Sequence, residues 1–370
     1  MTLDEYQKRA FETARVDWSD RAARAIPLLG IVGELGSVAS EMKKAVRDGK
    51  AYTDGPKQLC EEFGDLLWYV AAVATRQGIS LGALEKGAAP TSVHANGTPF
   101  AHLFALVSAV SALVEAVQLY DEDPSWARRR NLTKCLSTCL TALTSAIRQA
   151  KLKLGSVLAE NLRKGGSKFG DSPADAPAPC FDRTYPTYER LPREMQIQVL
   201  ERDRGQDRVE VILRSRDMNI GDRLTDNATR DDGYRYHDVF HFAYAAVLGW
   251  SPVIRALLRS KRKSNPKVDE AQDGARAGIV EEAIAHTVFQ YAEGHSLLRN
   301  LKHIDHGITQ LICRMVRGLE VEELAMHEWE RAIFVGFEAF RALKQHRGGW
   351  LMLNAETRSL TYSRDGPVVG

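Results

Sequence analysis

The sequence has 370 residues, with 50 lysines and arginines against 48 aspartates and glutamates, for a formal net charge of +2. This balance gives no general case for nucleic-acid binding, and a hydrophobic fraction of 44% is ordinary for a globular protein of about two domains. The five cysteines form no CxxC pair, which favours reduced residues in a cytoplasmic protein. No window is expected to reach about 18 uncharged apolar residues, so neither export nor membrane anchoring is predicted.

The first half of the chain has helical periodicity. Helices are expected over residues 28–50 and 58–78, and a loop rich in Pro, Gly, Ser and Thr follows at 87–99. A second helix pair is expected at 100–120 and 131–155. This pair keeps the apolar pattern of the first and lacks its acids, which indicates either a degenerate internal repeat or a match of composition alone.

The segment DSPADAPAP marks the domain boundary, because its three prolines prevent a regular element. We therefore predict an N-terminal domain at 1–174, a linker at 175–190 and a C-terminal domain at 191–370. In the last of these, MQIQVLER and RVEVILRS alternate with period two and predict a β-hairpin, before a mostly helical stretch and a strand near the end. The predicted fold is mainly α, with a helical bundle followed by a mostly helical domain that carries a small β element.

Acidic residues on two neighbouring predicted helices form the first candidate site. Glu34 and Glu41 lie seven residues apart, Glu62 and Asp65 lie three apart, and Glu61 adjoins them, so each pair shares one helix face. Burying an unpaired carboxylate costs several kcal/mol, so these acids need basic partners or a cation. If the two helices run antiparallel, the carboxylates can converge on a divalent ion.

Two interpretations of these acids stay open. Basic residues of the first helix, such as Lys43 and Lys44, could pair with them in a structural salt-bridge network. An all-oxygen ligand set instead suits a hard ion such as Mg²⁺, with Mn²⁺ as an alternative, and would support hydrolysis of a phosphoanhydride bond.

The stretches GELGSVASEMKK and EEFGDLLWYVAAVATRQGISL resemble the MazG-like all-α nucleoside triphosphate pyrophosphohydrolases, over Leu28 to Leu81. The resemblance implies Mg²⁺-dependent cleavage of nucleoside triphosphates between the α and β phosphates, giving the monophosphate and pyrophosphate. It implies that the metal ligands are Glu34, Glu62 and Asp65, with Glu41 and Glu61 assisting.

Ser37 stands where the family has the third glutamate of its first motif. Either Glu41 reaches the metal in its place, or the protein is a nucleotide-sensing or interaction protein with a weakened hydrolase site, with a role in stress or antiphage defence. NLRK at 161–164 is similar to the family's later basic motif, and the expected substrate contacts are Lys43, Lys44, Asn161, Lys164 and Lys168. Relatives build their sites from paired bundles, which points to a homo-oligomer unless the second helix pair completes the pocket.

A second polar cluster is predicted in the C-terminal domain. His237 and His241 lie four apart with Asp238 beside them, and a later helix carries Glu281, Glu282 and His286. These residues could form a metal site, a proton-transfer site or a satisfied core network, and metal-dependent catalysis there is a third functional hypothesis. HDVFH and DGARAGIVEE resemble the C-terminal domain attached to some MazG-like proteins, a resemblance that implies an architecture and no particular chemistry.

Overall fold

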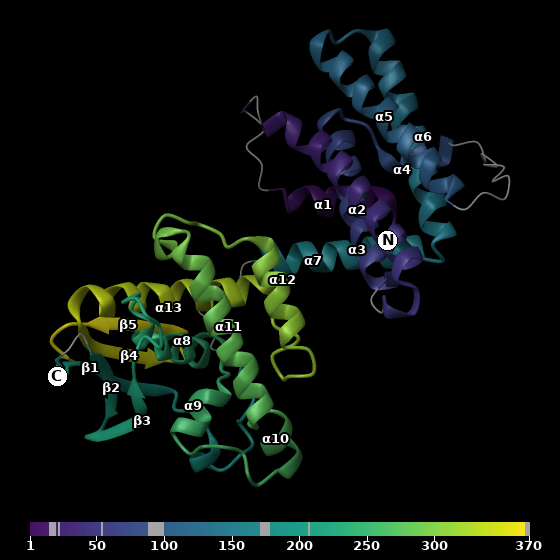
Figure 1. Ribbon diagram of the computed structural model, residues 1–370. Coiled ribbons are helices and arrows are strands. Elements are labelled where there is room, and N and C mark those ends of the chain that lie inside the picture. The colour runs from purple at the N-terminus through teal and green to yellow at the C-terminus, as the bar shows by residue number, and fades with distance from the viewer. Residues whose placement is uncertain are drawn as a thin grey trace. The chain divides into compact units, whose positions relative to one another are not determined.

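The computed structural model describes residues 1–14, 20, 23–52, 55–87, 100–170, 178–205 and 208–366. The chain divides into two compact units, Met1–Phe169 and Gly170–Gly370, which Figure 1 draws in purple to teal and in teal to yellow. Most described residues are helical, and the strands all belong to the second unit. The prediction of a mainly α fold is therefore confirmed. The proline-rich part of the predicted linker, at 171–177, lies outside the described residues.

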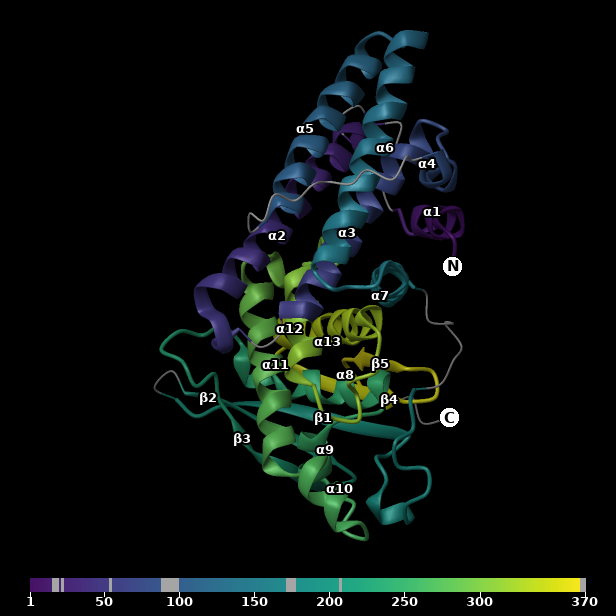
Figure 2. The same ribbon diagram turned by 90° about the vertical axis from the view of Figure 1, so that its right-hand side faces the viewer.

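The N-terminal unit is a helical assembly with its apolar side chains in one core. Its elements are α1 (Leu3–Glu12), η1 (Ala23–Ala25), α2 (Ile26–Asp48), η2 (Gly49–Ala51), α3 (Gly55–Arg76), α4 (Leu81–Gly87), α5 (Ala101–Glu122), α6 (Trp126–Gln149) and α7 (Leu154–Phe169). The helix pairs α2 with α3 and α5 with α6 pack together as predicted, and Figure 2 shows α5 and α6 running side by side. Helix α3 also contacts α1, α6 and α7, so it is the central helix of the unit.

Helix α5 is long and apolar enough to cross a membrane by length and composition. Every 18-residue window of this helix contains Glu115, so it is not the run of uncharged apolar residues whose absence was expected. Leu106 and Leu113 on one face of α5 are fully buried in the helical core, whereas Phe104 on another face is 64% exposed. Part of the apolar composition is thus used for packing within the unit.

Helix α7 was not predicted as a separate helix, since the helix expected at 131–155 includes only its first two residues. It packs against α1 and α3. Gly64 on α3 permits this approach, because a Cβ atom there would lie only 2.9 Å from the Cβ of Asn161 on α7. The missing side chain therefore brings a polar residue of α7 directly onto the acidic face of α3.

The C-terminal unit contains one five-stranded antiparallel sheet in the order β3-β2-β1-β4-β5. Its strands are β1 (Glu194–Asp203), β2 (Val209–Ser215), β3 (Met218–Leu224), β4 (Gly348–Asn354) and β5 (Ser359–Ser363). The predicted hairpin is confirmed as β1 and β2, with Val199 opposite Leu213. Two further strands come from the last part of the chain. Strand β4 pairs with β1, which lies far from it in sequence, and β5 pairs with β4.

Helices pack against this sheet and bury a large aromatic core. They are η3 (Thr187–Glu189), η4 (Tyr234–Tyr236), α8 (Asp238–Leu248), α9 (Pro252–Leu257), α10 (Pro266–Ala271), α11 (Ala275–Glu293), η5 (Ser296–Leu298), α12 (His306–Met315) and α13 (Met326–His346). Every residue of α8 is buried. Helix α8 lies between α13, α11, α9 and the strands β4 and β5, and Figure 1 shows α13 lying along the same two strands. A polar side chain on α8 is therefore held in place on all sides.

Buried ion pairs fix the segment before β1 to the helices. Asp182 accepts a hydrogen bond from Arg255 at 2.7 Å, and both side chains are 1% exposed. Asp273, with no exposed side-chain surface, accepts hydrogen bonds from Arg262, whose guanidinium also pairs with Glu320 at 2.8 Å. Arg262 belongs to the basic segment KRKSNPK at residues 261–267 and is a buried structural residue. Its charge can be buried because Asp273 and Glu320 are its partners.

Candidate active site and a second polar cluster

Three carboxylates of the N-terminal unit converge. Glu34 of α2 and Glu62 and Asp65 of α3 each offer one oxygen, and these oxygens lie within 4.8 Å of one another. The spacing of three residues places both acids of α3 on one face, and the packing of α2 against α3 brings Glu34 to them. All three residues are half-buried. The structure therefore brings together the predicted metal-ligand set.

These carboxylates repel one another. Burial, together with the neighbouring charge of Glu34, raises the pKa of Glu62 to about 8. Burial and the charge of Asp65 raise the pKa of Glu34, and burial raises the pKa of Asp65 although Lys164 opposes this shift. Glu62 therefore keeps its proton near neutral pH, because too little positive charge lies near the three carboxylates. A cation shared by the three oxygens would supply that charge.

Helix α7 holds Asp65 from the other side. Lys164 Nζ lies 2.5 Å from one oxygen of Asp65, and Asn161 Nδ2 donates to the other at 3.0 Å. Lys164 also lies 2.8 Å from Glu61, so one ammonium group neutralises two acids. Asn161 and Lys164, which were expected to contact substrate, thus bind carboxylates of the protein. Lys168 lies one turn further along the same helix.

Tyr6 completes this arrangement and was not predicted. Its hydroxyl donates to Asn161 Oδ1 at 2.7 Å, which leaves the amide nitrogen of Asn161 to face Asp65. Tyr6 has no exposed surface, and burial raises the pKa of its hydroxyl well above the ordinary value.

Tyr69 is a second residue near these carboxylates that was not predicted. Its ring lies over Gly30, where a Cβ atom would come within 2.4 Å of it, and burial and Glu34 raise the pKa of its hydroxyl.

Glu41 lies outside the converging set of three carboxylates. It is 8% exposed, and one of its oxygens accepts a hydrogen bond from Lys44 at 2.6 Å. Lys44 is therefore engaged with Glu41, whereas Lys43 points to an exposed surface of α2. Ser37 is half-buried and lies one turn after Glu34. The structure thus shows no carboxylate that takes the place of the glutamate missing at Ser37, since Glu41 is not part of the converging set.

In the C-terminal unit, His237 and His241 lie at the start of α8 and Glu282 lies on α11. One ligand atom of each falls within 4.8 Å of the others. Glu282 Oε2 is 3.4 Å from His241 Nε2 and 3.9 Å from His237 Nε2. Asp238 adds an oxygen 3.3 Å from His237 Nε2. His286 is separate from this group and packs edge-on against Tyr234.

Glu281 lies behind His241. It has no exposed side-chain surface, lies 2.9 Å from His241 Nδ1, and accepts hydrogen bonds from Ser251 Oγ at 2.6 Å and from the backbone N–H of Val253 at 2.9 Å. Burial lowers the pKa of His241, but Glu281 and Glu282 outweigh it and hold that pKa well above the ordinary value. Glu281 is therefore a partner that orients the imidazole.

The comparisons with known proteins bear on this second unit. The MazG C-terminal domain family matches residues 176–366, which is more than half of the chain. The chain belongs to this family. The resemblance of HDVFH and DGARAGIVEE to a MazG-associated domain is thereby confirmed. The match does not include the residues that carry Glu34, Glu62 and Asp65.

A phage protein is also similar. The Gene 37 protein of Mycobacterium phage L5 is 33% identical over 87 residues, which is 22% of this chain and 76% of that protein. No solved structure has a significant match to the chain.

Proposed function

We propose that the protein is a Mg²⁺-dependent nucleotide pyrophosphohydrolase that cleaves nucleoside triphosphates between the α and β phosphates. The observation that carries this proposal is the convergence of Glu34, Glu62 and Asp65 from two helices within 4.8 Å. The resemblance of GELGSVASEMKK and EEFGD to MazG-like enzymes assigns the same three residues as metal ligands. Geometry and motif thus agree on one ligand set.

The three residues fit a hard divalent ion. Their donors are all carboxylate oxygens, which Mg²⁺ and Mn²⁺ accept, and they are half-buried and short of positive charge. The bound ion would neutralise the phosphate oxygens and lower the pKa of a bound water. A Mg²⁺ ion keeps several waters, so three protein ligands leave room for phosphate oxygens.

The surrounding side chains would keep the ligands in place. Asn161 and Lys164 fix both oxygens of Asp65, so this carboxylate does not have to be ordered when metal and nucleotide bind. Glu61 remains beside the set with Lys164 as its partner and is the candidate for orienting the attacking water. Tyr69, next to Gly30 on α2, is placed to contact substrate near Glu34.

The direct test is a panel of canonical and modified nucleoside triphosphates with Mg²⁺ or Mn²⁺, assayed for pyrophosphate. We expect release from at least one of them, and its loss in Asp65→Asn. Asp48→Asn, a change at the exposed end of α2, is the matched control and should keep the activity. A panel without product in any member would overturn the proposal.

A second candidate function is a nucleotide-binding protein with a weakened hydrolase site. Two observations favour it: Ser37 supplies no carboxylate, and Glu41 is bonded to Lys44 rather than included in the converging set. Calorimetry distinguishes the two candidates. Tight binding of a triphosphate without turnover supports the binding protein, and turnover supports the enzyme.

A further inference from the structure

We propose that His237, His241 and Glu282 bind a divalent transition-metal ion of the Zn²⁺ class in the MazG C-terminal domain. Its residues differ from those of the proposed nucleotide site and lie in the other compact unit. Its donors are two imidazole nitrogens and one carboxylate oxygen.

The imidazole rings are already oriented as metal ligands. His237 Nδ1 lies 2.9 Å from the backbone carbonyl of Tyr234, and His241 Nδ1 lies 2.9 Å from the carboxylate of Glu281. Both partners can only accept, so each ring carries a proton on Nδ1, and the neutral form of each ring has its lone pair on Nε2. A histidine that donates its other N–H to a carboxylate or carbonyl is the usual arrangement around a protein-bound metal.

Glu281 is suited to this orienting role. It accepts hydrogen bonds from Ser251 and from the backbone of Val253 in addition to His241, so its position is fixed by three donors from two elements. Tyr234 fixes the other ring, because its own ring stacks on His237 with centroids 4.4 Å apart. Neither imidazole can turn without breaking these contacts.

The Nε2 atom of His241 lacks a hydrogen-bond partner, and that of His237 faces the carboxylates of Asp238 and Glu282. His241 has no exposed surface, and its Nε2 has no hydrogen-bond partner among the described residues. Glu282 Oε2, 3.4 Å away, has only lone pairs to offer when ionised. Buried polar atoms are rarely left unsatisfied. Two imidazole nitrogens and a carboxylate oxygen that face one another form a set of donors that a divalent cation would bind in place of a proton.

The ligand types select the class of ion. Two imidazoles with one carboxylate suit Zn²⁺ and other first-row divalent ions, whereas Mg²⁺ prefers oxygen alone. Three protein ligands leave at least one coordination position open, as in catalytic rather than structural zinc sites. The nitrogen donors distinguish this cluster from the all-oxygen set of Glu34, Glu62 and Asp65.

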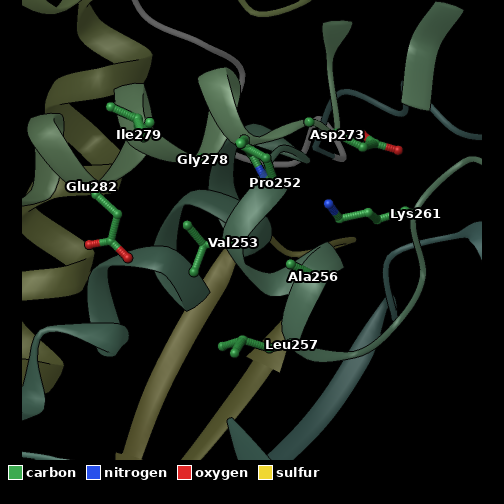
Figure 3. A pocket seen from close by; sticks show the side chains of 11 residues that line it. Pro252, Val253, Ala256, Leu257, Lys261, Asp273, Gly278, Ile279 and Glu282 are labelled. Atoms are coloured by element: carbon green, nitrogen blue, oxygen red, sulfur yellow. The ribbon is translucent and has the colours of Figure 1, made fainter. Parts of the chain in front are cut away.

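Of the three residues of the cluster, Glu282 borders a cavity. Glu282 has 46% of its side chain exposed and lines a cavity of about 380 Å³ between α9 and α11. Figure 3 shows Glu282 at one end of this cavity and Lys261 at the other, with Val253 and Ala256 between them. The histidines are more buried, with exposed fractions of 10% and 0%, so entry is from the Glu282 side.

The experiment uses the full chain carrying Asp65→Asn, which removes one ligand of the N-terminal set. After chelator treatment and dialysis, Zn²⁺ is titrated by calorimetry and Co²⁺ by visible absorption. We expect one Zn²⁺ per chain and a Co²⁺ absorption band typical of nitrogen ligands. Adding Glu281→Gln should weaken Zn²⁺ binding by about 10- to 100-fold, because it removes the partner that orients a ligand.

Ligand variants complete the design. Glu282→Gln and His237→Gln each remove a donor, and both should weaken Zn²⁺ binding more than Glu281→Gln and abolish the Co²⁺ band. Glu282 is partly exposed, so its variant should fold. His303→Ala removes a histidine whose side chain is 75% exposed and is the matched control that should bind Zn²⁺ as the parent does.

Two results would overturn the proposal. One is equal Zn²⁺ affinity in the parent and in Glu282→Gln. The other is no binding of Zn²⁺ or Co²⁺ by the folded parent, which would mean that a proton on His241 Nε2, facing Glu282, takes the place of the metal ion. Neither result bears on nucleotide hydrolysis, which is assayed separately.

Discussion

The two polar clusters differ in how their charges are arranged. In the N-terminal unit, three carboxylates converge, and of these three Lys164 pairs with Asp65 alone. In the C-terminal unit, Glu281 and the Tyr234 carbonyl turn two imidazole rings toward Glu282. The first set consists of oxygens and suits a hard ion, and the second is mixed and suits a softer one. The donor atoms thus determine which class of ion each cluster suits, and the neighbouring residues determine how those donors are oriented.

The largest expected stability effect concerns the buried ion pairs that hold the C-terminal unit. Asp273→Asn leaves Arg262, and Arg255 at 3.6 Å, short of a buried partner, which should cost about 3–5 kcal/mol in the free energy of unfolding. Chemical denaturation measures this loss. Glu270→Gln, an exposed change nearby, is the control, and an equal stability of both variants would contradict the account.

Removing a carboxylate charge from the N-terminal set should not lower the free energy of unfolding. Without a metal ion, Glu62→Gln relieves the repulsion between Glu62 and Glu34 that raises their pKa values, so it should not destabilise the chain. The contrast with Asp273→Asn separates a cluster built from like charges from one built from opposite charges. Thermal unfolding in EDTA tests it, and a loss of stability like that of Asp273→Asn would contradict it.

The next prediction concerns the residues that hold the proposed metal ligands in place. Asn161→Ala removes a donor to Asp65 and should lower Mg²⁺ affinity or activity by about 10- to 100-fold, the usual effect of losing such a partner. Tyr6→Phe removes only the hydroxyl that orients Asn161 and should cost less, about 0.5–1.5 kcal/mol for one hydrogen bond. Tyr120→Phe, which removes the hydroxyl of a half-buried tyrosine on α5, is the control. If Tyr6→Phe were as severe as Asn161→Ala, a role beyond orientation would be required.

A smaller gain is expected from restoring the missing glutamate. Ser37 lies one turn from Glu34 on the same face of α2, so Ser37→Glu should add a fourth carboxylate and raise Mg²⁺ affinity about tenfold, or roughly 1.4 kcal/mol. Gly36→Glu adds the same charge where nothing lies within 4 Å of the added Cβ and on a different face, so it should have no such effect. Equal effects of the two changes would show that only the net charge matters.

The last prediction concerns a dependence of stability on pH in the metal-free chain. Folding raises the pKa of Glu62 to about 8, so its stabilising effect is full below the unfolded pKa and is lost as the pH rises through about 8. In EDTA, the Tm should fall between about pH 5 and pH 9, and less so in Glu62→Gln. An identical pH profile for both chains would contradict the assignment.

Much of the candidate site could be predicted from local sequence, and its support could not. The spacing of Glu62 and Asp65 fixes their shared face on one helix. The contacts of Asp65 with Asn161 and Lys164 join residues 96 and 99 positions apart, and that of Tyr6 with Asn161 joins residues 155 apart. Local periodicity contains no information on such contacts.

The same limit explains the sheet. The alternation of β1 and β2 predicts a hairpin because its partners are close in sequence. The pairing of β1 with β4, such as Ile197 with Leu351, depends on the helices between them folding back. A short apolar strand at the end of the chain therefore could not be assigned to this sheet in advance.

The most direct test of the central claim is ³¹P NMR of the full chain with Mg²⁺ and its best triphosphate substrate in ¹⁸O-labelled water. We predict equal amounts of nucleoside monophosphate and pyrophosphate, no orthophosphate, and no reaction in Asp65→Asn. Orthophosphate as the product, or an Asp65→Asn chain as active as the parent, would contradict a pyrophosphohydrolase built on Glu34, Glu62 and Asp65.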